Sequence, residues 1–162
     1  MDIQIRQATA ADQRTIVDFN SKMAVETEGR TLDPDRMGPG VAALLADVTR
    51  GRYWLAIIDG EIAGQLLITY EWSDWHNGRY WWIQSVYVPA RFRRRGVFSA
   101  LYKHVESMAQ ADQDACGLRL YVETGNERAQ ETYRAIGMKK PGYLVMESIF
   151  TEQGMQKNAE SR

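Results

Sequence analysis

Residues 81–101 read WWIQSVYVPARFRRRGVFSAL, and the rest of the chain is organised around this segment. Its first part is rich in aromatic and β-branched residues, which predicts a buried strand. A turn rich in arginine and glycine follows and leads directly into an amphipathic helix with a buried stripe. The first backbone N–H groups of a helix have no partner within the helix and lie at the positive end of its dipole. We therefore predict an anion site at this turn and expect a diphosphate to bind there.

The chain has 162 residues, which predicts one domain at residues 1–150, and we expect residues 151–162 to form a polar tail. Its 20 basic and 21 acidic residues nearly cancel, so no overall field favours nucleic acid or an anionic membrane as a partner. No apolar run approaches the roughly 18 residues needed to cross a bilayer, and the N-terminus does not resemble a signal peptide. We therefore expect a cytoplasmic protein.

The single cysteine, Cys116, excludes an internal disulfide bond and fits a reducing compartment. Free cysteine is usually a small buried residue, so we expect Cys116 to be buried near the start of a strand. A role as a nucleophile is not indicated.

Periodicity and turn signals predict the other elements. Strands are expected at residues 3–7, 53–58, 62–70, 81–88, 118–122 and 138–150, the last interrupted by Pro141-Gly142. Helices are expected at residues 9–29, 41–51, 98–108 and 126–137, with loops at residues 29–39 and 72–79. Asp59-Gly60 predicts a two-residue hairpin. Because a helix joins them, the strands at 81–88 and 118–122 should be parallel.

Two motifs resemble those of the GCN5-related N-acetyltransferase (GNAT) family. Val86-Tyr87-Val88 followed by Arg93-Arg94-Arg95-Gly96-Val97-Phe98 is similar to its acetyl-CoA signature, Gln/Arg-x-x-Gly-x-Gly/Ala after a valine-rich strand. The family's second motif is similar to a later segment of this chain, Leu120-x-Val122-x-x-x-Asn126-x-x-Ala129-x-x-x-Tyr133-x-x-x-Gly137-Met138. The order of elements is similar as well, and the resemblance covers residues 3–149.

The resemblance implies an α/β (α+β) GNAT fold, with a mixed sheet of six to seven strands and about four helices. A bulge in the earlier strand would splay the parallel pair apart. It also implies an acetyl-CoA-dependent N-acetyltransferase that uses no metal and acts by direct transfer on a primary amine, in a small molecule or a peptide. The alternative is a catalytically inactive CoA-binding regulatory or interaction module of the same fold.

The resemblance also assigns roles to residues. The diphosphate would accept hydrogen bonds from the segment formed by Arg93, Arg94, Arg95, Gly96, Val97, Phe98 and Ser99. Val86 and Val88 would pair with the pantetheine arm, and a backbone N–H near Val88 would polarise the thioester. Asn126 would bond cofactor amides and cap its helix. Tyr133 would contact the cofactor and protonate the leaving thiolate, since a phenol of pKa about 10 can donate to a thiolate whose conjugate acid has a pKa of about 8.5.

Two departures from the family pattern concern Phe98 and the general base. Phe98 stands where the signature has Gly or Ala. Because Phe98 lies on the apolar stripe of the helix, we expect its side chain to point away from the diphosphate. The hydroxyl of Ser99 could add a hydrogen bond to the diphosphate. The strand near Trp82 offers no carboxylate. Candidate bases are Glu71, Glu26, Glu28, Glu123 and His76, of which we choose Glu71, at the end of its strand.

The aromatic segment Trp72–Arg79, together with Trp81 and Trp82, has two interpretations. It could wall an acceptor pocket for a cationic amine, or it could form the subunit interface of a homodimer. The sequence favours neither. The arginines between residues 91 and 95 could instead bind nucleic acid, but no stacking aromatic pattern accompanies them, so we do not expect a nucleic-acid partner.

Overall fold

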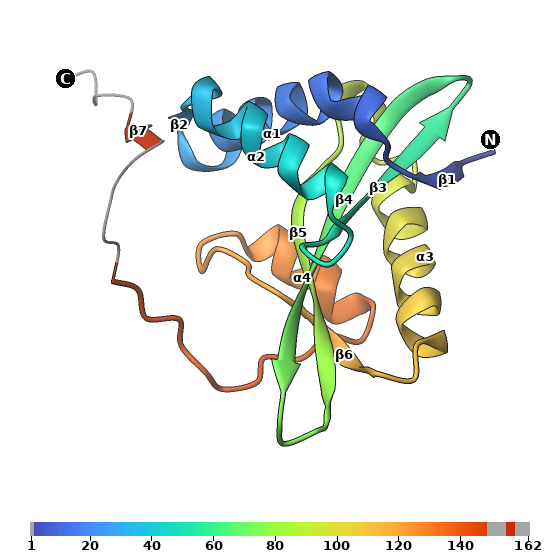
Figure 1. Cartoon of the computed structure of the whole chain (residues 1–162), viewed down its shortest axis with the longest axis vertical. Coiled ribbons are helices and arrows are strands. Elements are labelled where there is room, and N and C mark those ends of the chain that lie inside the picture. The colour runs from blue at the N-terminus through green and yellow to red at the C-terminus, as the bar shows by residue number, and fades with distance from the viewer. Residues whose placement is uncertain (1, 149–154, 158–162) are drawn as a thin grey trace.

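The computed structural model describes residues 2–148 and 155–157 (Figure 1). Its main sheet has five strands in the order β1-β3-β4-β5-β6. Their bounds are β1 (Gln4–Gln7), β3 (Arg52–Ile58), β4 (Glu61–Ser73), β5 (Gly78–Tyr87) and β6 (Ala115–Leu120). All neighbours are antiparallel except β5 and β6, which are parallel as predicted. A small second sheet pairs β2 (Arg30–Leu32) with β7 (Met155–Lys157).

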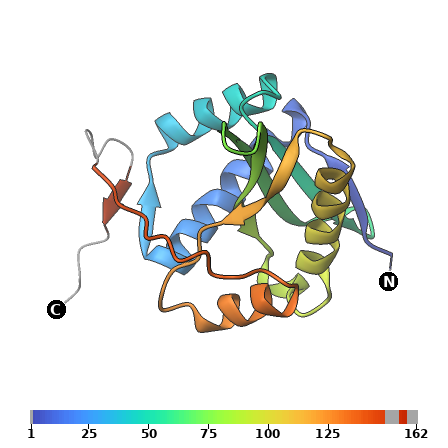
Figure 2. The same cartoon turned by 90° about the horizontal axis from the view of Figure 1, so that it is seen from below.

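Helices cover both faces of the main sheet. They are α1 (Gln13–Glu28), α2 (Pro34–Ala46), α3 (Val97–Ala111) and α4 (Glu127–Ala135), with short 3₁₀ turns at Ala10–Asp12 and Ala90–Phe92. Figure 2 shows α1 and α2 on one side of the sheet and α3 on the other. The expected mixed α/β architecture with four helices and a parallel strand pair is confirmed.

Two cores lie on opposite faces of the sheet, as the alternation of strand side chains requires. On the α3 face, Ile68 and Leu66 pack with Leu101 of α3. On the other face, Leu67 and Leu55 pack with Ile16 of α1. The neighbouring residues Leu66 and Leu67 thus belong to different cores, which fixes the register of β4.

The parallel strands β5 and β6 separate at one end. A register shift places Gln65 opposite Tyr87 and Leu67 opposite Gln84, so β5 contains one residue more than β4 over this interval. Ser85 in the bulge has a φ of 48°. The pairing of β5 with β6 ends at Ile83 and Leu120. The backbone of β5 beyond Ile83 is therefore free of β6, and the predicted bulge and splay are confirmed.

The prediction of a loop at residues 29–39 is wrong. Residues 30–32 form β2, and α2 begins at Pro34, well before the predicted start at Val41. The side chain of Asp33 accepts a hydrogen bond from the N–H of Asp35 at 2.9 Å, and Pro34 occupies the first helical turn. Asp-Pro is a helix-start signal, whereas the sequence analysis interpreted the proline and the glycines as loop residues.

The aromatic loop predicted at Trp72–Arg79 is shorter than expected. β4 continues through Ser73 and β5 begins at Gly78, so only residues 74–77 form the turn. The strand predicted at 118–122 is displaced, since β6 runs from Ala115 to Leu120. Cys116 lies near the start of this strand, as predicted, but it is half-buried rather than buried.

The strands predicted at residues 138–150 are absent from residues 138–148, which form no helix or strand, while residues 149 and 150 lie outside the described part. Four consecutive apolar side chains there are exposed: Tyr143, Leu144, Val145 and Met146. The main sheet therefore has five strands in the described residues rather than six to seven. Of the predicted polar tail, only residues 155–157 are described, and they form β7.

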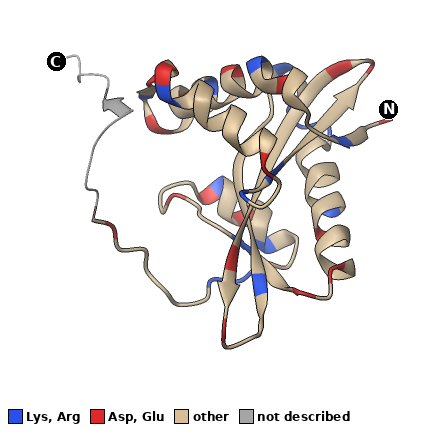
Figure 3. Cartoon of the chain, viewed as in Figure 1, with Lys and Arg blue, Asp and Glu red and all other residues tan. Residues whose placement is uncertain are grey.

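Charged residues of both signs are interspersed along most elements (Figure 3). None of the helices in the described part is long and apolar enough to cross a bilayer. Within the same residues, no three side chains of His, Cys, Asp or Glu come together as a set of metal ligands.

Candidate functional site

The signature turn ends at the start of α3. Gly96, which immediately precedes α3, has a φ of 80°, and Arg94 has a φ of 62°. Glycine adopts this left-handed conformation without steric cost. Gly96 is the N-cap residue and has no side chain to cap α3. The first backbone N–H groups of α3, at Val97 to Ser99, have no acceptor within the helix. This geometry provides donors for an anion where the sequence predicted one.

Gly64 of β4 allows the start of α3 to lie close to the sheet. A Cβ atom on Gly64 would lie 2.7 Å from Cγ1 of Val97 and 3.2 Å from the carbonyl oxygen of Tyr87. Any larger residue would push α3 away from the end of β5. The sequence analysis missed this contact, although a glycine inside a strand is a known signal of close approach.

The side chain of Arg93 binds within the protein. Its Nε donates to the carbonyl oxygen of Val88 at 2.9 Å, and its guanidinium pairs with Glu26 of α1. Tyr87 donates its hydroxyl to the same carboxylate at 2.8 Å. Hydrogen bonds from Arg93 and Tyr87 hold the pKa of Glu26 below its ordinary value. Arg93 thus fixes the signature turn to α1 and to the end of β5.

A buried polar row lies behind the bulge of β5. The amide of Gln65 donates to Oδ1 of Asn20 at 2.7 Å and to the carbonyl oxygen of Ser85 at 3.3 Å. Asn20 in turn donates to the hydroxyl of Tyr53 at 3.0 Å. The row connects α1, β3 and β4 to the bulge, next to Val86 and Val88. No sequence pattern links these residues, and the sequence analysis missed them.

Tyr133 lies on α4 and Asn126 immediately precedes that helix. Oδ1 of Asn126 accepts a hydrogen bond from the N–H of Ala129 at 3.1 Å, which confirms the predicted helix cap. Tyr133 is half-buried, and burial raises the pKa of its phenol. Its ring centroid lies 5.8 Å from that of Phe98, which packs against the α3 core. Phe98 thus fills the space between α3 and α4, while Ser99 is exposed beside it.

Glu71 lies on the sheet face opposite α3. Its carboxylate accepts a hydrogen bond from the indole N–H of Trp82 at 2.6 Å and pairs with Arg119 at 3.1 Å. The ring of Trp82 lies 4.4 Å from that of Tyr121, and Arg119 stacks over Tyr80 at 3.5 Å. The site therefore combines one carboxylate, one guanidinium and three aromatic rings on adjacent strands.

The other candidate bases lie elsewhere. Glu28 is 3.6 Å from Arg30 at the end of α1. Nδ1 of His76 is 2.9 Å from the hydroxyl of Ser73, in the β4–β5 turn. Glu123 lies in the connection to α4, where its carbonyl oxygen accepts from Gln130. Of the predicted candidates, Glu26 is the one bonded to the end of β5.

Comparisons with known proteins agree with this arrangement. Residues 20–138 match the family model of the acetyltransferase (GNAT) family. A crystal structure of a possible acetyltransferase from Clostridium difficile 630 is 41% identical, with a TM-score of 0.87, and the match covers 92% of this chain and 98% of that one. A predicted acetyltransferase from Clostridium acetobutylicum, solved with acetyl-CoA, is 16% identical, with a TM-score of 0.71 and coverage of 90% and 96%, and shows the same fold.

The match to a relative whose name states an activity covers a shorter part of the chain. The thialysine N-epsilon-acetyltransferase of Bos taurus is 33% identical over 76 residues, which make up 47% of this chain. The match spans 44% of the length of the bovine protein.

Proposed function

Because this chain belongs to the acetyltransferase (GNAT) family, we propose that it transfers an acetyl group from acetyl-CoA directly to a primary amine. The observation that carries the proposal is the convergence of three features at one end of the sheet. These are the uncapped start of α3, the released backbone of β5 and the half-buried phenol of Tyr133 on the neighbouring helix.

The residues at this end of the sheet suit acetyl-CoA as a co-substrate. The N–H groups from Arg94 to Ser99 would hold the diphosphate, with the hydroxyl of Ser99 exposed beside them. The N–H of Arg93 donates to the carbonyl oxygen of Ala90 at 3.2 Å and so turns away from this role. Val86 and Val88 would pair with the pantetheine arm as an added strand does, because β6 leaves their backbone free. Asn126 would orient the cofactor amides from the start of α4.

In the proposed reaction the amine nitrogen bonds to the carbonyl carbon of the thioester, and the carbon–sulfur bond breaks. Tyr133 gives its proton to the departing thiolate. The phenol of Tyr133 is protonated at neutral pH, because its ordinary pKa of about 10 is raised further by burial, so it has a proton to donate. The amine loses its own proton to Glu71, which we retain as the proposed base.

The face around Glu71 supports a cationic acceptor. The rings of Trp82 and Tyr121 attract an ammonium group by cation–π contact, and Glu71, whose charge is shared with Arg119, offers it a carboxylate oxygen. The bovine relative's name refers to the Nε amine of thialysine, so small amino acids with a side-chain amine are the first acceptors to test.

The first measurement is a calorimetric titration of acetyl-CoA, followed by a thiol-release assay with lysine-like amines. We expect Tyr133→Phe to lower turnover about 100-fold, because removal of a general acid typically costs two to four orders of magnitude, and to leave acetyl-CoA affinity unchanged. Tyr143→Phe is the matched control, since Tyr143 is 77% exposed and outside the site. Saturable binding without thiol release from any amine would instead support the inactive CoA-binding module.

The role of Glu71 has a separate test. We expect Glu71→Gln to lower turnover about tenfold or more without changing the affinity for acetyl-CoA. Asp74→Asn is the control, because Asp74 is a neighbouring exposed carboxylate in the β4–β5 turn. Equal turnover in wild type and Glu71→Gln would exclude Glu71 as the base and direct attention to Glu26.

A further inference from the structure

Unpaired polar atoms gather on the α3 face of the sheet. In the described part of the chain, six buried side-chain nitrogen or oxygen atoms have no hydrogen-bond partner. One is Oε1 of Gln65, behind the bulge. The other five are nitrogen atoms of residues on the α3 face or on α3 itself: Arg52, Trp54, Arg79, Trp81 and His104. Buried donors without partners are rare in proteins and call for an explanation.

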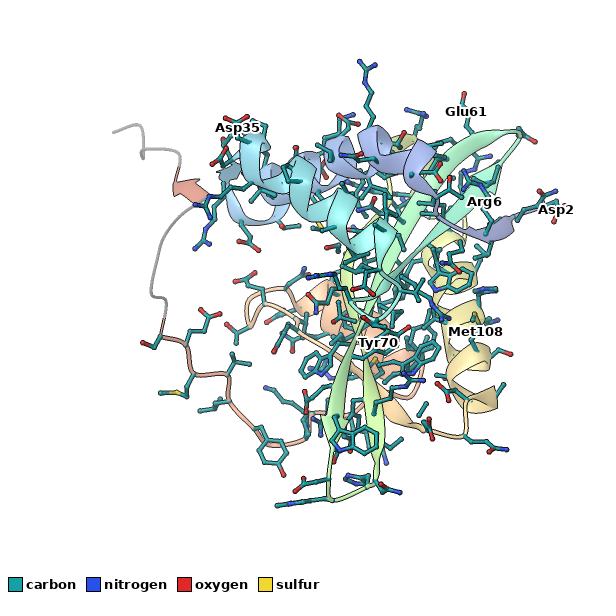
Figure 4. The ribbon with its side chains drawn as sticks, in the orientation of Figure 1. Asp2, Arg6, Asp35, Glu61, Tyr70 and Met108 are labelled. Atoms are coloured by element: carbon teal, nitrogen blue, oxygen red, sulfur yellow. The ribbon has the colours of Figure 1, made fainter. Side chains whose placement is uncertain are left out.

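Three of these residues line one cavity of about 510 Å³, at the end of the sheet remote from the signature turn. They are Arg52 on β3, and Arg79 and Trp81 on β5. Tyr70 on β4 and Met108 on α3 line it as well, and Figure 4 labels both side chains. This volume is within the range of small-molecule sites, roughly 300–1,000 Å³. The C-terminal half of α3 walls this cavity, whereas its N-terminus forms the proposed diphosphate site.

The cavity carries a net positive charge. Arg79 pairs with Asp112 at 3.1 Å and lies over the ring of Tyr70 at 5.1 Å. Arg52 is half-buried, and among residues 2–148 it has no carboxylate within ion-pair distance. Two guanidinium groups and one carboxylate therefore leave one positive charge uncompensated. Both arginines are only half-buried, and the side chain of Arg79 is 39% exposed, so this charge is partly desolvated and a neighbouring anion would stabilise it.

Trp81 adds a neutral donor to this charge. Its side chain is 3% exposed, and its indole N–H has no acceptor among the described residues. The ring packs edge-on against Tyr70, with centroids 5.6 Å apart. Indole can only donate, and guanidinium can only donate. The carboxylate of Asp112 also lines the cavity, but it is paired with Arg79, so the lining suits a ligand group that accepts from the remaining donors.

We propose that this cavity binds a small organic carboxylate. The carboxylate oxygens accept from the terminal nitrogens of Arg52 and Arg79, and one negative charge balances the excess positive charge of the lining. The indole nitrogen of Trp81 is inaccessible in this structure, and it becomes a further donor when its ring turns toward the ligand. Met108 and Ala111 of α3 contact the apolar body of the ligand. The site is separate from the acceptor face around Glu71, which lies on the opposite side of the sheet.

The indole N–H of Trp81 provides a direct readout. A titration of benzoate into ¹⁵N-labelled full-length protein, with the Trp81 resonance assigned through Trp81→Phe, should shift that resonance downfield and saturate. Benzyl alcohol, which has the same ring without the charge, should not shift it. We expect Arg52→Gln to weaken benzoate binding about tenfold or more, since it removes a charge-assisted hydrogen bond.

Two further variants keep the test decisive. Arg14→Gln is the matched control, because Arg14 is an exposed arginine on α1 and its loss should leave benzoate binding unchanged. Arg52→Lys keeps the charge if Arg52→Gln fails to fold, and it should bind benzoate more weakly than wild type does. No shift of the Trp81 resonance would overturn the proposal. A shift that does not saturate, or that is equal in Arg14→Gln and Arg52→Gln, would also overturn it.

Discussion

The first two thirds of the molecule and its C-terminal part differ in burial. Within residues 2–148, every side chain that is almost completely inaccessible lies between Ile16 and Val105. In contrast, α4 has no buried residue, and in the described chain after Ala109 no residue is buried. Ile136 and Met138, both half-buried, join the C-terminal part to the main core.

The two regions have different roles in the proposed function. The well-packed region holds the bulge, the turn and α3 in fixed geometry through buried contacts. The C-terminal part carries Asn126 and Tyr133, the residues proposed to meet the cofactor, with little burial of its own. Elements that close on a ligand are commonly drawn from the less stable part of a protein. The comparison therefore predicts that substitutions of buried residues in the first region lower the stability of the core. Substitutions of Asn126 and Tyr133 in the second region should leave the stability of that core unchanged and instead alter cofactor contact or turnover.

The largest expected effect contrasts two leucines. Leu101 is fully buried in the α3 core and Leu144 is 88% exposed. We expect Leu101→Ala to lower the free energy of unfolding by about 3–4 kcal/mol, through lost burial and a cavity. Leu144→Ala should change it by less than about 0.5 kcal/mol. Urea denaturation of both variants measures the contrast. A loss of similar size in Leu144→Ala would mean that the C-terminal part is packed in solution.

A smaller effect is expected at Asp12, at the start of α1. Arg6 donates to both carboxylate oxygens, at 2.7 and 2.8 Å, and lowers the pKa of the buried Asp12 from 3.8 to about 2. Because the pKa is lower in the folded state, the stabilisation is complete above the ordinary pKa and is lost as the pH falls toward 2. A shift of this size corresponds to about 2 kcal/mol.

Asp12→Asn tests this value. At neutral pH the variant should be less stable than wild type by about 2 kcal/mol in urea denaturation, and the difference should shrink as the pH falls below 3.8. Asp18→Asn is the control, because Asp18 forms an exposed i,i+4 pair with Lys22. A difference that does not change with pH would show that Asp12 acts through its shape and not through its charge.

The sequence predicted elements best where local chemistry decides the backbone. Asp59-Gly60 forms the predicted turn with φ values of 50° and 81°, and Asn126 caps its helix. The bulge of β5 and its separation from β6 were predicted from the resemblance to the GNAT family. By contrast, the first turns of α2 were missed because Pro34 was interpreted as a loop signal, although proline in the first turn of a helix needs no hydrogen-bond donor.

The remaining features depend on long-range contacts. The partners Glu26 and Arg93 are far apart in the chain, and so are Asn20 and Gln65, so no periodicity connects them. The apolar residues at 143–146 have the composition of a strand, yet they are exposed. A strand forms only where a neighbour supplies backbone partners, and a sequence pattern does not reveal whether that neighbour exists.

The smallest expected effect tests the C-terminal part directly. Asn126→Ala removes the hydrogen bond to Ala129, and loss of such a cap destabilises a helix by about 1 kcal/mol. Since α4 contributes no buried residue, this loss should speed amide hydrogen exchange in α4 and leave exchange in α3 unchanged. Acetyl-CoA should slow exchange in wild-type α4, and should do so less in Asn126→Ala, because the variant also loses the proposed contact with the cofactor amides.

Thr132→Ala is the control, since its hydroxyl bonds to Arg128 within α4 and is exposed. If acetyl-CoA protects α4 equally in wild type and Asn126→Ala, Asn126 is a helix cap and does not contact the cofactor. If Asn126→Ala accelerates exchange in α3 as well, the two regions unfold together and the contrast between them does not hold. Faster exchange confined to α4, with weaker protection by acetyl-CoA, would place both the cap and the cofactor contact on one side chain.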